Sequence, residues 1–143
     1  MHLTTFSDYS MRVLMYLALQ QEKRVTIADI AQRYQISDNH LTKVVHFLAR
    51  AGYVRTIRGK GGGLKLNRSV EAINLGEVLR WTEGDEGLLP CVHGEGDCCL
   101  IPVCKLTGIL RESQQAIYQV LDKYTLADLL VDKAPLRQIL MPN

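Results

Sequence analysis

Apolar side chains recur at helical spacing through the first third of the chain, with short polar breaks between the runs. Between residues 7 and 20 they follow the i, i+3, i+4, i+7 pattern of an amphipathic helix, and Ser7 is the predicted N-cap. A second, shorter helix is predicted from Thr26 to about Tyr34, because Thr26 and Asp29 have the spacing of a capping box. The pattern therefore predicts two helices of unequal length, each with one buried face.

A third helix follows after a short break. Gln35 and Ile36 are predicted to form a tight turn, Ser37 caps the helix, and Gly52 ends it. Positions 41, 44, 45 and 48 are apolar and share one face, whereas the opposite face is polar and basic. A short helix, a tight turn and a second helix with a basic face are typical of a helix-turn-helix, whose second helix enters the major groove of DNA.

A β-hairpin is predicted directly after this helix. Residues 53–57 and 64–66 have strand character, and the glycine-rich stretch RGKGGG at 58–63 forms the loop between them. Such a hairpin is the wing of a winged helix: its glycines let the backbone approach phosphates, and an arginine at its tip can enter a minor groove. The glycines complete neither the G-x-G-x-x-G fingerprint nor a P-loop, so a nucleotide-binding loop is not predicted.

Charge is distributed unevenly along the chain. Residues 1–68 carry eleven Lys and Arg against four Asp and Glu, a net charge of +7, whereas residues 69–143 have a net charge of −5. No acidic residue occurs from position 43 to position 69. The charge split, the helix-turn-helix spacing and the basic wing together favour DNA binding over an ordinary solvated helix face and a flexible turn. The predicted DNA contacts are Ser37, Asn39, His40, Lys43, His46, Arg50, Arg55, Arg58, Lys60 and Gly61.

The second half of the chain is predicted to hold one short and one long helix before its end. Asn74 and Glu77 have capping-box spacing and begin a helix that ends near Trp81. A long helix with an apolar stripe runs from about residue 105 to residue 124, and a short terminal helix starts at 125–128. The stripe predicts a dimer interface, because a complete winged helix leaves little for this helix to cover within one chain. Packing against the chain's own core is the alternative.

The predicted fold is mainly α with a small β-hairpin. A winged helix-turn-helix DNA-binding domain is expected at 1–80, a linker with a cysteine-rich loop at 81–104, and a dimerisation helix with a short C-terminal helix at 105–143. A hydrophobic fraction of 47% and a charged fraction of 22% are typical of a globular protein. The longest apolar run, 13–19, is too short to span a bilayer, and the first residues lack a secretory signal. We therefore expect a cytoplasmic protein with no membrane partner.

All four cysteines lie in one stretch, CVHGEGDCCLIPVCKL at 91–106. Cytoplasmic thiols stay reduced, so their clustering indicates metal binding or redox chemistry rather than disulfides. No C-x-x-C pair is present, which disfavours a zinc ribbon or a thioredoxin-like site. The neighbours Cys98 and Cys99 are unsuited to binding one centre together, which leaves three thiolates for an iron–sulfur cluster with one non-cysteine ligand. A four-cysteine zinc site and a zinc or redox enzyme remain alternatives, although the motifs G-x-S-x-G and H-E-x-x-H are absent.

Four stretches together resemble a known family. They are FSDYSMRVLMYLA near the start, the wing RGKGGGLKL, the loop ending in PVCKL, and YTLADL near the end. They resemble the NsrR family of nitric-oxide-sensitive repressors, which belongs to a group of winged-helix regulators that also contains the iron–sulfur regulator IscR. The resemblance implies a non-enzymatic homodimer with one cluster per subunit, [4Fe–4S] rather than [2Fe–2S]. Such a dimer binds operator DNA, represses genes for nitric oxide detoxification, and releases the DNA when nitric oxide reacts with the cluster.

The resemblance also implies which cysteines are ligands. The three family cysteines correspond to Cys91, Cys98 and Cys104, which leaves Cys99 as an extra thiol. IscR-like regulators have a histidine three residues after the last cysteine, where this chain has Thr107. A regulator of cluster biogenesis or cysteine metabolism is therefore the less favoured alternative.

The fourth ligand is less defined than the cysteines. In NsrR it can be an aspartate on the first helix of the partner subunit, and the corresponding residue is Asp8. A carboxylate there also has a simpler explanation, since it stabilises the first turn of its own helix. His93, within the loop, is the other candidate ligand.

Overall fold

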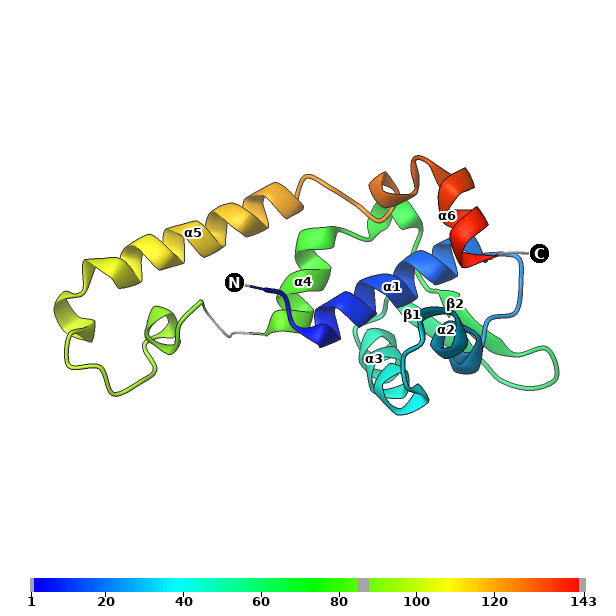
Figure 1. Ribbon diagram of the computed structural model, residues 1–143, viewed down its shortest axis with the longest axis horizontal. Coiled ribbons are helices and arrows are strands. Elements are labelled where there is room, and N and C mark those ends of the chain that lie inside the picture. The colour runs from blue at the N-terminus through cyan, green and yellow to red at the C-terminus, as the bar shows by residue number, and fades with distance from the viewer. Residues whose placement is uncertain (1, 85–87, 142–143) are drawn as a thin grey trace.

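One long helix extends from a body of shorter helices and a small β-hairpin (Figure 1). The computed structural model describes residues 2–84 and 88–141. Its α-helices are α1 (Thr5–Leu19), α2 (Ile27–Tyr34), α3 (Asp38–Arg50), α4 (Leu75–Glu83), α5 (Lys105–Leu121) and α6 (Lys133–Leu140). Strands β1 (Val54–Ile57) and β2 (Gly63–Leu66) pair with each other, and 3₁₀ turns lie at η1 (Val70–Ala72), η2 (Pro90–His93), η3 (Ile101–Val103) and η4 (Asp128–Leu130). The predicted fold class, mainly α with a small hairpin, is confirmed.

Local capping interactions set the boundaries of the helix-turn-helix. α2 begins with a complete capping box, in which the Asp29 N–H donates to Thr26 Oγ1 at 3.2 Å and the Thr26 N–H donates to the Asp29 carboxylate at 2.7 Å. Gln35 then adopts a left-handed conformation with φ of 54°, which turns the chain between α2 and α3. At the start of α3 the His40 N–H donates to Ser37 Oγ at 3.3 Å. The predicted second helix, turn and third helix are confirmed.

The prediction that Ser7 caps the first helix is wrong. Thr4 is the N-cap, because its Oγ1 accepts from the Ser7 N–H at 3.2 Å, and Ser7 is fully buried in the first turn of α1. The carboxylate of Glu83, at the end of α4, accepts from the Thr4 N–H at 2.9 Å, from the Thr4 hydroxyl at 3.0 Å and from the Ser7 hydroxyl. The helix begins before its predicted cap because Thr4 caps it locally, and a carboxylate from a distant helix adds hydrogen bonds to polar groups at that N-terminus.

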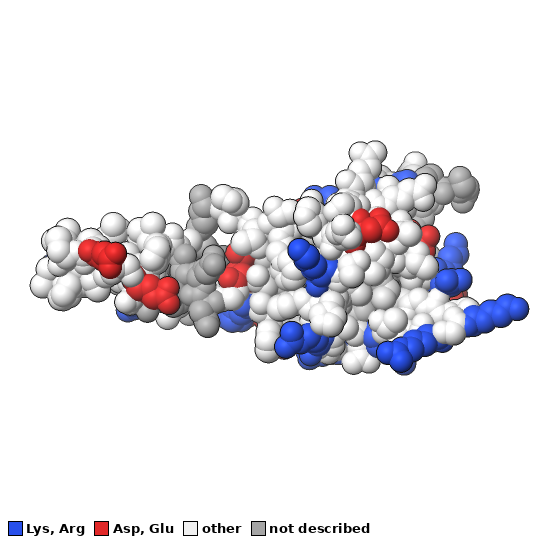
Figure 2. All heavy atoms as spheres, turned by 90° about the horizontal axis from the view of Figure 1, so that it is seen from below, with Lys and Arg blue, Asp and Glu red and all other residues white. Residues whose placement is uncertain are grey.

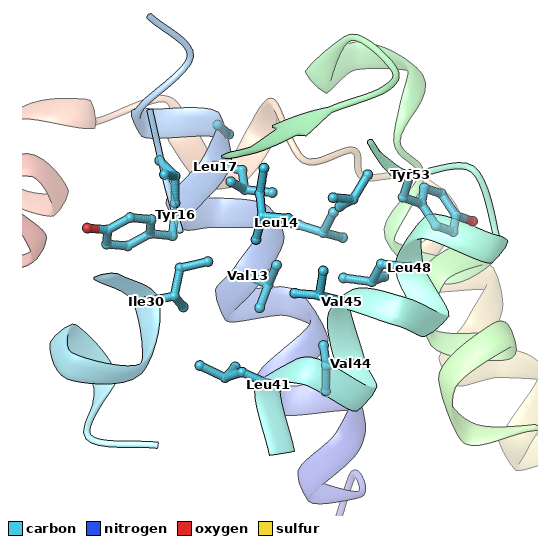
Figure 3. Close-up of a cluster of buried hydrophobic side chains, with 14 of the residues drawn as sticks. Val13, Leu14, Tyr16, Leu17, Ile30, Leu41, Val44, Val45, Leu48 and Tyr53 are labelled. Atoms are coloured by element: carbon cyan, nitrogen blue, oxygen red, sulfur yellow. The ribbon is translucent and has the colours of Figure 1, made fainter. Parts of the chain in front are cut away.

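The core lies between α1, α2, α3 and the hairpin (Figure 3). The four apolar positions predicted for α3, Leu41, Val44, Val45 and Leu48, are all buried. α1 is buried more widely than its predicted stripe, since elements pack against it on several sides. Its buried apolar side chains are Val13, Leu14, Tyr16, Leu17, Ala18 and Leu19.

The hairpin is joined at its base to the chain between α1 and α2. β1 and β2 pair antiparallel, with Val54 opposite Leu66. The Leu64 N–H donates to the Val25 carbonyl at 2.7 Å, so a bridge at Val25 extends the small sheet by one position. A Cβ at Gly63 would lie 2.6 Å from that carbonyl, which explains why glycine occupies this position.

The C-terminal segment pairs with the chain beside α4 before it forms its last helix. The Leu126 N–H donates to the Ile73 carbonyl at 2.8 Å, and the Ala127 N–H donates to the Val70 carbonyl at 3.2 Å. These bonds hold the start of the segment against the chain beside α4, and the helical turn that follows ends at Asp132, whose φ of −108° and ψ of 80° are not helical. The helix predicted to start at 125–128 is reduced to the turn η4, and α-helical structure resumes at α6.

α5 begins at Lys105 as predicted and projects away from the body (Figure 1). The C-terminal end of α5 packs against α4, and α5 also packs against η2 of the cysteine loop. Neither α5 nor another helix in the described part of the chain is long and apolar enough to cross a membrane.

Replacing Leu48 with alanine is expected to lower the free energy of unfolding by about 2–5 kcal/mol, because it removes a fully buried side chain from the core. Urea denaturation followed by circular dichroism measures this loss. His46→Ala, on the exposed face of the same helix, is the matched control and should change the free energy by less than ~0.5 kcal/mol. Equal losses in both variants would contradict the role of Leu48 in the core.

Candidate DNA-binding surface and cysteine loop

The polar face of α3 is open to solvent. Every predicted DNA contact on this helix and its cap is exposed, namely Ser37, Asn39, His40, Lys43, His46 and Arg50. The apolar side chains on the opposite face are buried, so the orientation of the helix is determined by the core. The exposed face can therefore enter a DNA groove without any rearrangement of the packing beneath it.

The predicted contacts in the wing, Arg55, Arg58, Lys60 and Gly61, are exposed as well. The three basic residues among them, Arg55, Arg58 and Lys60, form no salt bridge with a residue that the structure describes. Gly61 has φ of 88°, a conformation that other residues rarely adopt, so the tip of the loop requires glycine. Figure 2 shows Lys and Arg side chains spread over the body and projecting from one end of it. Cations without acidic partners are suited to binding phosphates.

Aromatic contacts join the start of α1 to α3. The rings of Phe6 and Phe47 meet edge to face, with centroids 5.2 Å apart and an interplanar angle of 87°. The rings of Tyr9 and His40 lie 6.3 Å apart. His40 lies on the exposed face of α3. A displacement at the start of α1 would therefore move a side chain on this face.

Asp8, the predicted fourth ligand, is half-buried on α1. Both of its carboxylate oxygens accept from Arg12 Nε at 3.0 Å, and this hydrogen bonding is the main reason that the pKa of Arg12 is raised. The Arg12 guanidinium also lies 5.5 Å from the centroid of the Tyr34 ring, at the end of α2. Asp8 is accessible, but it has a competing cation on its own helix.

The four thiols lie along one loop but do not converge. Cys91 is half-buried in η2, and Cys104 is the N-cap residue of α5. Cys98 and Cys99 are exposed between them. In residues 2–84 and 88–141, no three His, Cys, Asp or Glu side chains are grouped closely enough to hold a metal ion. A single chain in this conformation therefore supplies the donors without assembling them.

Contacts with α5 hold the first part of the loop. Arg111 Nη2 donates to the Val92 carbonyl at 2.7 Å, and the Val92 side chain is buried. His93 follows directly, but its side chain lies outside the described part of the structure, so its role as an alternative ligand stays a prediction.

Thr107 lies where the cysteine loop meets α5. Its buried hydroxyl forms no hydrogen bond of ordinary geometry with the described residues. That hydroxyl lies close to the Cys104 thiol and is the largest influence that lowers the pKa of this thiol. The N–H of Thr107 has the next largest effect, in the same direction. A thiolate or a metal-bound sulfur at Cys104 would give the hydroxyl an acceptor. Three thiol donors and a hydroxyl beside one of them thus fit the chemistry of an iron–sulfur cluster.

Comparison with known proteins places the chain among regulators of transcription. Residues 3–132 match the Rrf2 family, described as iron-dependent transcriptional regulators. The chain belongs to the Rrf2 family. Similar Rrf2 proteins include the transcriptional regulator NsrR of Bacillus licheniformis, 45% identical over 98% of this chain and 99% of that protein. NsrR of Bacillus subtilis is 46% identical over 98% of this chain and 97% of that protein.

Solved structures agree with this Rrf2 membership. IscR from T. potens has a TM-score of 0.73 at 28% identity and covers 96% of this chain and 91% of its own. CymR, the global cysteine regulator of B. subtilis, has a TM-score of 0.68 at 28% identity, with 90% of this chain and 95% of its own covered. The chain is therefore a DNA-binding transcriptional regulator with the Rrf2 winged-helix fold.

Two residues near the predicted ligand were missed by the sequence prediction. Arg12 could have been found, because its i, i+4 spacing from Asp8 on a helix favours an ion pair. Glu83 could not, because its hydrogen bonds to Thr4 join positions 79 residues apart.

Proposed function

We propose that the chain is a homodimeric cytoplasmic repressor that releases operator DNA when nitric oxide reacts with an iron–sulfur cluster in its cysteine loop. The observation that carries this proposal is the similarity to NsrR regulators, at 43–46% identity over nearly the whole chain. IscR and CymR are similar at only 28% identity, and Thr107 replaces the histidine of IscR-like regulators. Nitric oxide sensing is therefore favoured over control of cluster biogenesis or cysteine metabolism.

Operator binding is assigned to the exposed face of α3 and to the wing. Asn39, His40 and Lys43, near the N-terminal end of α3, would meet base edges in the major groove. Arg55 and Arg58, which form no salt bridge with a described residue, would neutralise backbone phosphates on either side of the groove. The base contacts would supply specificity, and the phosphate contacts would supply affinity.

The apolar stripe of α5 supports a dimer. Leu106, Ile109 and Val120 are 53%, 58% and 53% exposed, and apolar side chains grouped in this way usually mark an interaction surface. A second copy of α5 would cover them through a two-fold axis. Two recognition helices related by that axis can read half-sites about 34–36 Å apart.

The proposed ligands are Cys91, Cys98 and Cys104, with Asp8 of the partner subunit as the fourth. When bound, an iron–sulfur cluster supplies iron that reacts with nitric oxide. The chain contributes three thiolates, an exposed loop that gives nitric oxide access, and the Thr107 hydroxyl, which can donate to the Cys104 sulfur. This donor set suits [4Fe–4S] and [2Fe–2S] clusters, and the resemblance to NsrR favours [4Fe–4S].

The fourth ligand provides a physical route from the loop to the DNA-binding face. Asp8 lies on α1 between Phe6 and Tyr9, which contact α3 through Phe47 and His40. A carboxylate held by the partner's loop would fix this end of α1 relative to the other subunit. Once released, the carboxylate returns to Arg12 on its own helix, and the separation of the two α3 helices is no longer fixed.

Operator affinity is expected to depend on the state of the cluster. The probe is a duplex that the cluster-loaded protein selects from a random-sequence library, titrated with cluster-loaded, cluster-free and nitric-oxide-exposed protein. The loaded form should bind at least about tenfold more tightly than the other two forms, and a scrambled duplex serves as control. Equal affinity in all three states would rule out the proposed switch.

The ligand assignment predicts different outcomes for the adjacent thiols. Cys91→Ala, Cys98→Ala and Cys104→Ala should abolish the visible absorbance of the anaerobically purified protein, because each removes a ligand. Cys99→Ala should retain that absorbance and is the matched control for Cys98→Ala. If Cys99→Ala loses the absorbance while Cys98→Ala keeps it, the middle ligand is Cys99.

The wing is expected to contribute to the salt dependence of DNA binding. Arg58→Gln should reduce the slope of log K against log salt by about 1, because one phosphate contact is lost. Arg137→Gln on α6 removes the same charge outside the proposed DNA surface and should leave the slope nearly unchanged. A wild-type slope in Arg58→Gln would count against contact between the wing and DNA.

A further inference from the structure

The joint between α4 and α5 attaches the long helix to the winged domain. The Leu75 N–H donates to the Tyr124 carbonyl at 3.0 Å, and Asn74 Nδ2 donates to the Asp122 carbonyl at 2.8 Å. Both bonds join the start of α4 to the residues that directly follow α5. Contacts at one such place fix a pivot but leave the direction of α5 free to change.

A second contact, further along α4, removes this freedom. Arg80 donates to both carboxylate oxygens of Asp122, at 2.6 Å each, and its guanidinium lies 4.7 Å from the centroid of the Tyr118 ring. One side chain of α4 thereby contacts two successive turns of α5, and the planar guanidinium restricts the angle between them. Gly76 permits this approach, since a Cβ there would collide with the Asp122 carboxylate and lie 3.0 Å from the Asp122 nitrogen.

Stability alone does not account for the Arg80–Asp122 pair. Asp122 is the C-cap residue of α5, where a negative charge opposes the helix dipole. Arg80 offsets that penalty, and its hydrogen bonds lower the pKa of Asp122. Both side chains are well exposed, however, and exposed ion pairs contribute little to the free energy of unfolding. What distinguishes Arg80 is therefore its geometry, in which one side chain of α4 contacts both Asp122 and Tyr118.

Because α5 is long, a small change of angle at this joint moves the far end of the helix by several ångströms. α5 has 17 residues. A helix of that length spans about 25 Å, so a rotation of about 10° at one end displaces the other by about 4 Å. We infer that Arg80, Asp122 and Gly76 are positioning residues that set the angle between α5 and the winged domain, and through it the separation of the two recognition helices in the dimer. This inference rests on the proposed function as a dimeric DNA-binding repressor.

The inference is tested with Arg80→Gln and Asp122→Asn on three kinds of probe. The first is a duplex with two half-sites, selected by the wild-type protein from a random-sequence library. The second is the same duplex with one half-site scrambled, and the third has its spacer lengthened or shortened by one base pair. Each variant should lose about tenfold in affinity for the paired half-sites, keep wild-type affinity for the single half-site, and discriminate less between spacer lengths.

The two substitutions also control for each other. They change the net charge in opposite directions, so a loss shared by both cannot come from long-range attraction to DNA. The double variant should bind no more weakly than either single variant, because both act on one contact. Lys123→Gln makes the same charge change as Arg80→Gln beside the joint, and it should bind all probes like the wild type.

Several outcomes would overturn the inference. Wild-type affinity and spacer preference in both variants would show that the pair does not set the geometry. Equal losses on single and paired half-sites, or a lowered melting temperature by circular dichroism, would indicate a general structural defect. A wild-type protein that sediments as a monomer, or that does not prefer paired half-sites, would overturn the proposed dimeric function and the inference with it.

Discussion

The burial of α1 is the constraint on which the rest of the structure depends. α3, α4, β2, α6 and η4, drawn from both halves of the chain, all pack against it. Close packing makes such a helix difficult to move without moving its neighbours. The first turn of α1 is joined to Glu83 at the base of the cysteine loop and, through Phe6, to the recognition helix. α1 thus contacts both the end of α4, which precedes the cysteine loop in the chain, and the helix proposed to bind DNA.

The helix-turn-helix could be predicted from the sequence because the interactions that determine it are local. Thr26 and Asp29 cap α2 from three residues apart, and Ser37 caps α3 over the same distance. The buried face of α3 follows from helical periodicity, and the hairpin from the glycines between its two strands. No distant residue is needed for any of these assignments.

The remaining features depend on contacts that sequence spacing does not reveal. Glu83 contacts the start of α1 from 79 residues away, and the segment at 125–128 is held against the chain beside α4 by bonds from Leu126 and Ala127. The candidate ligands illustrate the same limit for the site. Their identity could be suggested from the spacing of the thiols and the resemblance to NsrR, but the cysteines are not grouped within one described chain, and Asp8 is paired with Arg12. A site shared between subunits, of the kind proposed, would not be encoded in local patterns.

The bridge between Leu64 and Val25 has a consequence for the entropy of DNA binding. It restrains the base of the wing, where Arg55 lies on a paired strand, whereas the loop that carries Arg58 and Lys60 is closed by its own turn, in which the Gly62 N–H donates to the Gly59 carbonyl at 2.9 Å. The backbone of a restrained strand loses little conformational freedom when its side chain meets a phosphate, whereas the backbone of a loop has more freedom to lose. Arg55 would therefore be the contact of the wing whose backbone is already in place before DNA binds.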